Sequence, residues 1–414
     1  MLGRIKALKL ILLFALINSS IFIGFHFQGF SLIRISIVVL LLISVCLLFI
    51  LSIKKEKQTF YIHPYFKFLL FLLFFWSFFT IFRSFSINSK DLISLFGHYL
   101  MGWAWTTPLA IVFGLNIYNW MGIFNFLVKL LLVGMVLSII FIPFTGDKYA
   151  FGIIEWLQFF PILLLTYVYQ HKINKKIILL ATISFIIVSI IISQRINAAY
   201  IIMTIFFTIV EFFRYKKTDK LKKLFVSVII VLSVLGLSVT ASDIYTKITE
   251  DKSVTTDTRT FLFVELFADM SDNELIIGRG ALGTYYSPYF AYTQKHGLGG
   301  DSSTRMVNEV GYLQMILKGG FIMMFLCLLI LLPAAYLGIF KSKNLIARMS
   351  GYIILIYLVI WIVSYYSVYS AEYILLWMAV GTAISPIARN TTDKELKIYI
   401  NGGYNNWKKI TKHL

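Results

Sequence analysis

Residues 311–338 read GYLQMILKGGFIMMFLCLLILLPAAYLG, with Lys318 as their single charged residue. A helix of about 20 apolar residues crosses the hydrocarbon core of a bilayer, so this run predicts a membrane-spanning helix. The whole chain has the same character, because 59% of its 414 residues are hydrophobic and only 14% are charged. Such a composition leaves too few polar residues to cover a soluble globule. The sequence therefore predicts a membrane protein.

Further apolar runs of comparable length occur along the rest of the chain. Backbone groups in hydrocarbon find no water to bond, and no alternating barrel pattern is visible, so each run predicts a helix. The expected fold is an all-α polytopic membrane protein with about twelve transmembrane helices. The predicted spans are 7–25, 32–53, 65–82, 93–114, 124–144, 150–170, 177–193, 197–213, 224–240, 311–338, 349–368 and 371–388.

One long polar interruption, residues 241–310, separates the ninth and tenth predicted spans. It holds ten of the chain's 19 carboxylates and six basic residues, so its net charge is −4 while that of the whole chain is +19. An enzyme that acts at a membrane face would keep its polar groups in such a loop. We therefore divide the chain into helices one to nine (1–240), a catalytic loop with short interfacial helices (241–310), helices ten to twelve (311–388) and a basic tail (389–414).

Basic residues gather on alternate sides of the predicted spans. Loops that remain in the cytoplasm carry an excess of Lys and Arg, and one topology assigns every cluster to them, including Lys341, Lys343 and Arg348. Both termini are then cytoplasmic, and residues 241–310 lie outside. Because the basic excess belongs to the cytoplasmic face, we expect it to meet the headgroups of the lipid bilayer and we do not expect nucleic-acid binding.

Two arginines stand at predicted helix starts. Asp257-Thr258-Arg259 precedes the apolar segment 260–267, where Asp is a favoured capping residue. Arg259 either pairs with a lipid headgroup or binds a substrate anion. Arg195 follows Ser193 in the predicted turn before span 197–213. It either snorkels to the interface or binds an anion at the membrane surface, and we favour the second interpretation.

Residues 278–283 read GRGALG and match the GxGxxG pattern. A dinucleotide fold needs that pattern in a strand–turn–helix unit of a parallel sheet. The loop is too short for such a sheet, and residues 285–292 do not resemble the helix that the pattern opens. We expect instead that Gly278 and Gly280 allow a tight turn close to a ligand, with Arg279 beside them. A plain glycine-rich turn is the alternative.

Glu309 precedes span 311–338 at its predicted outer mouth. It is either a carboxylate favoured by the dipole at a helix N-terminus or a general base. No paired His or Cys spacing predicts a metal site, and no cofactor is expected. Further ionisable residues at or inside the predicted outer half of the membrane, where such groups are often functional, are Arg83, His98, Lys148 and Glu155.

Four motifs in this order resemble the O-antigen polymerase and O-antigen ligase superfamily. They are Ser-x-Arg at a helix start (193–195), Asp-x-Arg (257–259), Gly-x-Gly-x-x-Gly-x-Tyr (278–285), and Glu309 followed by Leu313 and Gly320. The motifs cover residues 180–325, and the remainder is similar in topology only. Many members, above all the ligases, have His-Asn where this chain has Glu309 and Val310. This difference favours a polymerase over a ligase and leaves the identity of the base open.

The resemblance implies a glycosyltransferase in the cytoplasmic (inner) membrane of a bacterium. Its donor would be an oligosaccharide linked to a polyprenyl diphosphate, undecaprenyl in particular, and its product a longer lipid-linked polysaccharide. Implied protein partners are a chain-length regulator and a flippase. Implied catalytic residues are Glu309 as base and Arg259 and Arg195 on the diphosphate. Implied substrate-binding residues are Arg279, Arg305, Gly278, Gly280, Tyr285 and Asn308.

Two alternatives remain. An O-antigen ligase, which transfers lipid-linked glycan to a lipid or protein acceptor, shares the arginines and differs at Glu309. A flippase for lipid-linked oligosaccharides would act on the same substrate. Transporters commonly show repeated halves and interrupted helices, which this sequence does not show, and long loops such as 241–310 are usually functional. We therefore expect an enzyme.

Overall fold

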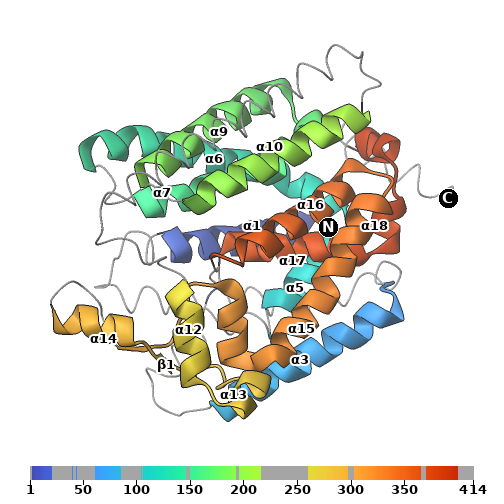
Figure 1. Ribbon diagram of the computed structural model, residues 1–414. Coiled ribbons are helices and arrows are strands. Elements are labelled where there is room, and N and C mark those ends of the chain that lie inside the picture. Colours follow the sequence, from blue (N-terminus) through green and yellow to red (C-terminus); the bar gives the residue numbers. More distant parts are fainter. Residues whose placement is uncertain are drawn as a thin grey trace.

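The computed structural model is predominantly helical (Figure 1). It describes residues 2–20, 61–84, 106–145, 150–192, 195–215, 260–296, 303–364 and 370–399, with Leu40, Ile43 and Ala104. Within these ranges, five helices are long and apolar enough to cross a membrane. They are α3 (Pro64–Arg83), α6 (Tyr118–Thr145), α9 (Lys172–Ile192), α10 (Arg195–Tyr215) and α15 (Gly311–Phe340).

Shorter helices complete the bundle. Five predicted spans, 65–82, 124–144, 177–193, 197–213 and 311–338, coincide with the five long helices. Spans 32–53 and 224–240 lie outside the described residues, apart from Leu40 and Ile43, so the total of twelve stays a prediction. The shorter helices are α1 (Leu2–Ile17), α5 (Thr106–Gly114), α7 (Ala150–Leu157), α8 (Phe160–Leu165), η3 (Tyr167–Tyr169), α16 (Leu345–Ile360), α17 (Ala371–Ile384) and α18 (Pro386–Asn390).

The predicted span 150–170 is interrupted. α7 ends at Leu157, and α8 begins at Phe160 with Pro161 in its first turn. Proline lacks the N–H that a continuous helix would use, so it is tolerated at a helix start and disfavoured inside. The apolar run therefore continues through a turn, which hydropathy alone does not reveal.

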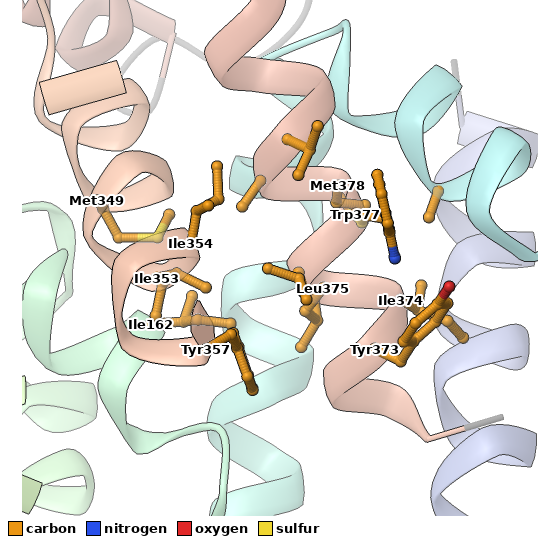
Figure 2. Packing of buried hydrophobic residues seen from close by; sticks show 14 of the residues in the cluster. Ile162, Met349, Ile353, Ile354, Tyr357, Tyr373, Ile374, Leu375, Trp377 and Met378 are labelled. Atoms are coloured by element: carbon orange, nitrogen blue, oxygen red, sulfur yellow. The ribbon is translucent and has the colours of Figure 1, made fainter. Parts of the chain in front are cut away.

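Helix α17 lies at the centre of the core and packs against α5, α16, α15 and α1. Figure 2 shows side chains of α16, such as Ile353 and Ile354, beside those of α17. Gly114 of α5 and Gly381 of α17 let the two backbones approach so closely that a Cβ at either would collide with the other helix. Small residues serve this purpose in membrane helix pairs. Thr382 Oγ1 donates to the Gly114 carbonyl oxygen at 2.7 Å across the same contact.

A buried ion pair joins α10 to α16. Arg348 Nε lies 3.0 Å from both carboxylate oxygens of Glu211, and Tyr352 Oη donates to Glu211 at 2.7 Å. Both charged residues are buried. Arg348 was predicted to lie in a loop, and the structure corrects this, because Arg348 is part of the first turn of α16. The excess of Lys and Arg in cytoplasmic loops could not predict its place, because its partner is a buried acid on another helix.

Helix α15 is broken at Gly320, which has φ 70° and ψ −175°. The break frees carbonyl oxygens that lipid could not satisfy. Protein groups replace the missing helix bonds. The backbone N–H groups of Arg279 and Gly280 donate to the carbonyl oxygens of Leu317 and Lys318 at 2.8 and 3.0 Å. The indole N–H of Trp76 in α3 donates to the Gly319 carbonyl oxygen at 2.7 Å.

The described part of the loop before α15 folds as short helices and one two-stranded ladder. These are α12 (Thr260–Asp269), α13 (Asp272–Ile277), β1 (Tyr285–Tyr286), α14 (Pro288–Lys295) and β2 (Thr304–Arg305). Strand β1 pairs with β2 antiparallel, with Tyr285 opposite Arg305. Thus no parallel dinucleotide-binding sheet occurs among the described residues.

Helix α14 begins after the glycine turn and strand β1. Ser287 caps it by accepting a hydrogen bond from the Phe290 N–H at 3.3 Å, and Pro288 occupies its first position. Both are established signals for a helix N-terminus. A dinucleotide-binding helix would have followed the glycines directly, whereas α14 starts at this Ser-Pro pair, which was not recognised from the sequence.

Candidate functional site

The loop elements are anchored to the first half of α15 by a small apolar core. Leu262 and Leu266 of α12 and Tyr285 of β1 pack with Leu313 and Leu317 of α15. Figure 1 shows α12 and α13 beside α15, with α14 extending away from them. The polar side chains of the loop are therefore held at one end of the helical bundle. This is the region in which the sequence placed most of its candidate site residues.

Arg279 is bound entirely within the loop. Its Nε and Nη2 donate to Glu274 at 3.0 and 3.1 Å, and its Nη1 donates to the Asp269 carboxylate. The remaining N–H groups donate to the backbone carbonyl oxygens of Asp269 and Thr284. All five guanidinium N–H donors are therefore used. The hydrogen bond from Arg279 is the main cause that lowers the pKa of Glu274 to about 2. Arg279 thus ties α12, α13 and the residue before β1 together, and a substrate contact would require one of these bonds to break.

The glycine turn approaches α15. Gly278 and Gly280 have φ values of 75° and 86°, which only glycine adopts readily. The backbone N–H groups from Gly278 to Ala281 all donate to protein carbonyl oxygens. The buried Lys318 Nζ also donates to the Gly283 carbonyl oxygen. The predicted tight turn is confirmed, and its partner in the structure is the broken helix. Its predicted contact with a substrate stays a prediction.

Arg305 and Glu309 form an ion pair at the entrance to α15. Arg305 Nη2 donates to Glu309 Oε1 at 3.1 Å, and the guanidinium carbon lies 3.9 Å from the centroid of the Phe290 ring. The side chains of Arg305 and Glu309 are 21% and 43% exposed, so the pair faces the solvent side of the site. Arg305 Nη1 meets no acceptor at hydrogen-bond geometry among the described residues. Nη1 is itself buried, and the buried Tyr285 side chain interacts with this guanidinium.

Tyr285 lies next to this pair. It faces Arg305 across the β1–β2 ladder and is 1% exposed. Burial raises the pKa of Tyr285 to about 12, and the positive charge of Arg305 partly opposes this shift. Tyr285 is therefore a neutral phenol at physiological pH and contributes to the wall of the site.

Glu265 fixes α14 beside the same site. Its carboxylate accepts hydrogen bonds from Ser287 Oγ at 2.5 Å and from the Tyr289 N–H at 2.9 Å. A carboxylate at a helix N-terminus is favourable because it meets unpaired N–H groups and the positive end of the dipole. Since α14 carries Phe290, Glu265 indirectly holds the ring on which Arg305 rests. Nothing in the sequence analysis singled out Glu265 or Phe290 for this role.

Other predicted residues are described in part. Arg195 is the first residue of α10, and its side chain lies outside the described residues, as do all of Arg259, His98 and Lys148. Arg83 ends α3, and its Nη1 donates to the Ile277 carbonyl oxygen at 2.8 Å. The structure thus brings Arg279, Arg305, Tyr285, Asn308 and Glu309 together in the loop. Arg195 and Arg259 remain predicted members of the site.

A second polar cluster, which sequence reasoning missed as a group, lies within the bundle. Tyr200 Oη and Tyr357 Oη are 3.2 Å apart. Glu155 of α7 is an electrostatic neighbour of the buried Glu372 of α17, and the side-chain amide group of Gln158 lies against the Glu372 carboxylate. Tyr200 lies five residues beyond Arg195 on α10, about 7–8 Å along the helix axis. Only Glu155 stood out in the sequence, because the partners come from four separate helices.

The loop site combines a guanidinium and a carboxylate at contact distance. A guanidinium stabilises phosphate oxygens through directed, charged hydrogen bonds, and a carboxylate can take a proton from a hydroxyl group. Among the described residues, no three His, Cys, Asp or Glu side chains gather as a possible metal site. No family model, curated protein or solved structure matches this chain, so its function must be argued from this chemistry.

Proposed function

We propose that this protein is a membrane glycosyltransferase that polymerises oligosaccharide units carried on undecaprenyl diphosphate at the outer face of the bacterial inner membrane. The Arg305–Glu309 pair carries the proposal. It lies in a folded loop at the end of an apolar helical bundle, where a lipid-linked donor and a sugar acceptor can meet. The resemblance of the four motifs to O-antigen polymerases supports the same assignment.

The proposed reaction requires two tasks from the protein. The hydroxyl oxygen of the acceptor sugar attacks the anomeric carbon of the donor, and the bond from that carbon to the diphosphate oxygen breaks. The electron pair of the broken bond leaves with the diphosphate, and the hydroxyl proton passes to a base. Arg305 would stabilise the leaving diphosphate, since its guanidinium stays charged at every working pH. Glu309 would take the proton.

Arg195 and Arg259 are proposed as further diphosphate ligands, in keeping with their motif positions. Arg195 begins α10, and Arg259 directly precedes α12, so each stands at a helix start. Replacement of Arg195 by Ala should abolish polymer formation. Replacement by Lys should restore little, because lysine does not reproduce the bidentate geometry of the guanidinium. Full activity in either variant would remove Arg195 from the site.

The decisive experiment deletes the gene in its host and compares surface polysaccharide on gels. The deletion strain is complemented with wild type, Arg259→Ala or Glu309→Gln. A polymerase predicts that the deletion strain adds one repeat unit to its acceptor and makes no ladder, and that neither variant restores the ladder. Full-length polymer retained on the polyprenyl carrier would identify a ligase instead. Single units trapped on the cytoplasmic side would identify a flippase.

A further inference from the structure

Two side-chain amides hold the backbone on both sides of Glu309. The N–H of Asn308 donates to Gln314 Oε1 at 2.7 Å. The N–H of Val310 donates to Asn308 Oδ1 at 3.0 Å. Asn308 is fully buried, and Gln314, in the second turn of α15, is 7% exposed. The two amide oxygens therefore fix the peptide groups that flank the proposed base.

These contacts also fix the direction of both amide nitrogens. An amide oxygen that accepts from a backbone N–H cannot exchange places with its NH₂ group, which could only donate. Asn308 Nδ2 and Gln314 Nε2 are both buried, and neither meets an acceptor among the described residues. Together they carry four N–H bonds. A buried donor without an acceptor is destabilising by about 1–3 kcal/mol, so an acceptor from outside the chain is expected here.

The first two N–H groups of α15 already have acceptors. The N–H groups of Gly311 and Tyr312 are occupied by the Trp361 carbonyl oxygen at the end of α16, at 3.0 and 3.4 Å. Among the side chains of residues 308–314, the buried groups without an acceptor are the two amide nitrogens, and both can only donate. A sugar hydroxyl both donates and accepts, whereas a phosphate oxygen only accepts. A set composed of donors alone therefore suits phosphate better than a hydroxyl.

We propose that Asn308 and Gln314 form a subsite for phosphate oxygens of the lipid-linked diphosphate, next to Arg305 and Glu309. The proposal rests on the function proposed above and extends it to Gln314, which no sequence motif indicated. Arg305 and Glu309 form a partly exposed pair, and such pairs contribute only about 0–1 kcal/mol. Such a pair costs little to separate, which makes Arg305 available to the same diphosphate.

The test measures binding of undecaprenyl diphosphate to full-length protein in phosphatidylcholine nanodiscs. Gln314→Met keeps the side-chain volume and removes its amide. Asn308→Ser keeps an oxygen that can accept from Val310 and removes the NH₂ group. Each variant should bind about 10–100-fold more weakly, the loss expected for one hydrogen bond to a charged group. Gln294→Met, on exposed α14, is the control and should bind as wild type does.

Competition identifies the source of the phosphate. Inorganic pyrophosphate should displace the probe, whereas addition of phosphatidylglycerol to the discs should not. Displacement by phosphatidylglycerol would assign the subsite to bilayer lipid and overturn the proposal. Unchanged affinity in both variants would also overturn it, because the amide donors would then be satisfied by internal water. The melting temperature of each unliganded variant shows whether it folds. If one variant does not fold, binding is judged from the other.

The outcomes separate this subsite from the proposed function. A wild-type protein that polymerises in cells but binds no diphosphate through Asn308 and Gln314 would refute the subsite and leave the polymerase proposal standing. The opposite result would be binding of diphosphate through these residues together with an intact ladder in the strain that lacks the gene. That result would refute polymerisation and leave the subsite standing.

Discussion

Arg305 Nη2 donates to Glu309 Oε1 at 3.1 Å, while the guanidinium of the same arginine lies over the Phe290 ring. The arginine is therefore placed by α14 and β2, and the carboxylate by the start of α15. Arg305 and Glu309 lie four residues apart in the segment that joins β2 to α15. The proposed cation for the leaving group and the proposed base are thus held by one short segment, which α14 supports through Phe290.

Glu309→Gln should lower polymer formation by about 10²–10⁴-fold, the usual contribution of a general base. The protein should fold normally, because a partly exposed ion pair stabilises little. The measurement is quantitative gel analysis of polysaccharide at matched protein level in the membrane. Asp272→Asn, an exposed carboxylate on α13 of the same loop, is the control. Equal ladders from both variants would exclude Glu309 as the base.

Arg279→Lys should loosen the loop, because lysine cannot make the five hydrogen bonds that link α12, α13 and Thr284. Loss of a charged hydrogen bond costs on the order of 2 kcal/mol. Residues 260–296 should become sensitive to protease in detergent-solubilised protein. Arg83→Lys is the control, since Arg83 makes a single bond to Ile277 that lysine can replace. Lost polymer with unchanged protease resistance would instead make Arg279 a ligand of the substrate.

Long apolar runs predicted α3, α6, α9, α10 and α15 well, because hydropathy over about 20 residues determines whether a helix can span lipid. The same signal could not locate the break at Gly320. Apolar residues continue on both sides of it, and the break is stabilised by Gly280 and Trp76 from distant segments. Arg348 was misplaced for a related reason. Its partner Glu211 lies on another helix and becomes visible only after folding.

The sequence predicted which residues belong to the candidate site, but it predicted only some of the contacts between them. Sequence order brought Arg305 and Glu309 within four residues, and the structure pairs them. Arg279 was predicted to bind substrate because it is an arginine beside glycines. In the structure its N–H groups instead donate to Asp269 and Glu274. Gln314 was overlooked because its role depends on the burial of its amide nitrogen. Spacing along a sequence does not reveal whether a polar group has found a partner.

Gly320→Ala should separate the loop from α15. Gly320 has φ 70°, and a Cβ there would collide with the carbonyl oxygen of Ile276 in α13. The left-handed conformation alone costs a non-glycine residue about 1–2 kcal/mol, and the collision adds to it. The expected result is a lower melting temperature with increased protease cleavage in residues 260–296. Leu329→Ala, at an exposed position of α15, should change neither, and identical behaviour of the two variants would contradict the docking role of Gly320.

Acid should destabilise the folded part of the loop, residues 260–296. The pKa of Glu274 falls from 4.5 to about 2, mainly through the hydrogen bond from Arg279. A carboxylate whose pKa is lowered by folding stabilises the protein fully above its unfolded pKa, and this contribution disappears as pH falls toward the folded pKa. Pepsin cleavage of residues 260–296, normalised to an unfolded peptide, should therefore rise between pH 4.5 and pH 2. Glu274→Gln should be cleaved readily across this whole range; a pH-dependent rise that persists in this variant would assign the effect to another group.

Glu211 and Arg348 should be strongly coupled. Arg348→Met leaves the buried Glu211 carboxylate with the more distant Arg214, whose Nη1 lies 3.7 Å from Oε1. Breaking a buried pair typically costs about 3–5 kcal/mol, a large part of a domain's stability. The double variant Glu211→Leu with Arg348→Met buries no charge and should recover most of that loss. Melting temperatures of wild type, both single variants and the double variant in one detergent provide the cycle. Simple addition of the two single effects would show that the pair is not an energetic unit. Recovery in the double variant would show that the pair specifies the contact between α10 and α16 without being required for folding.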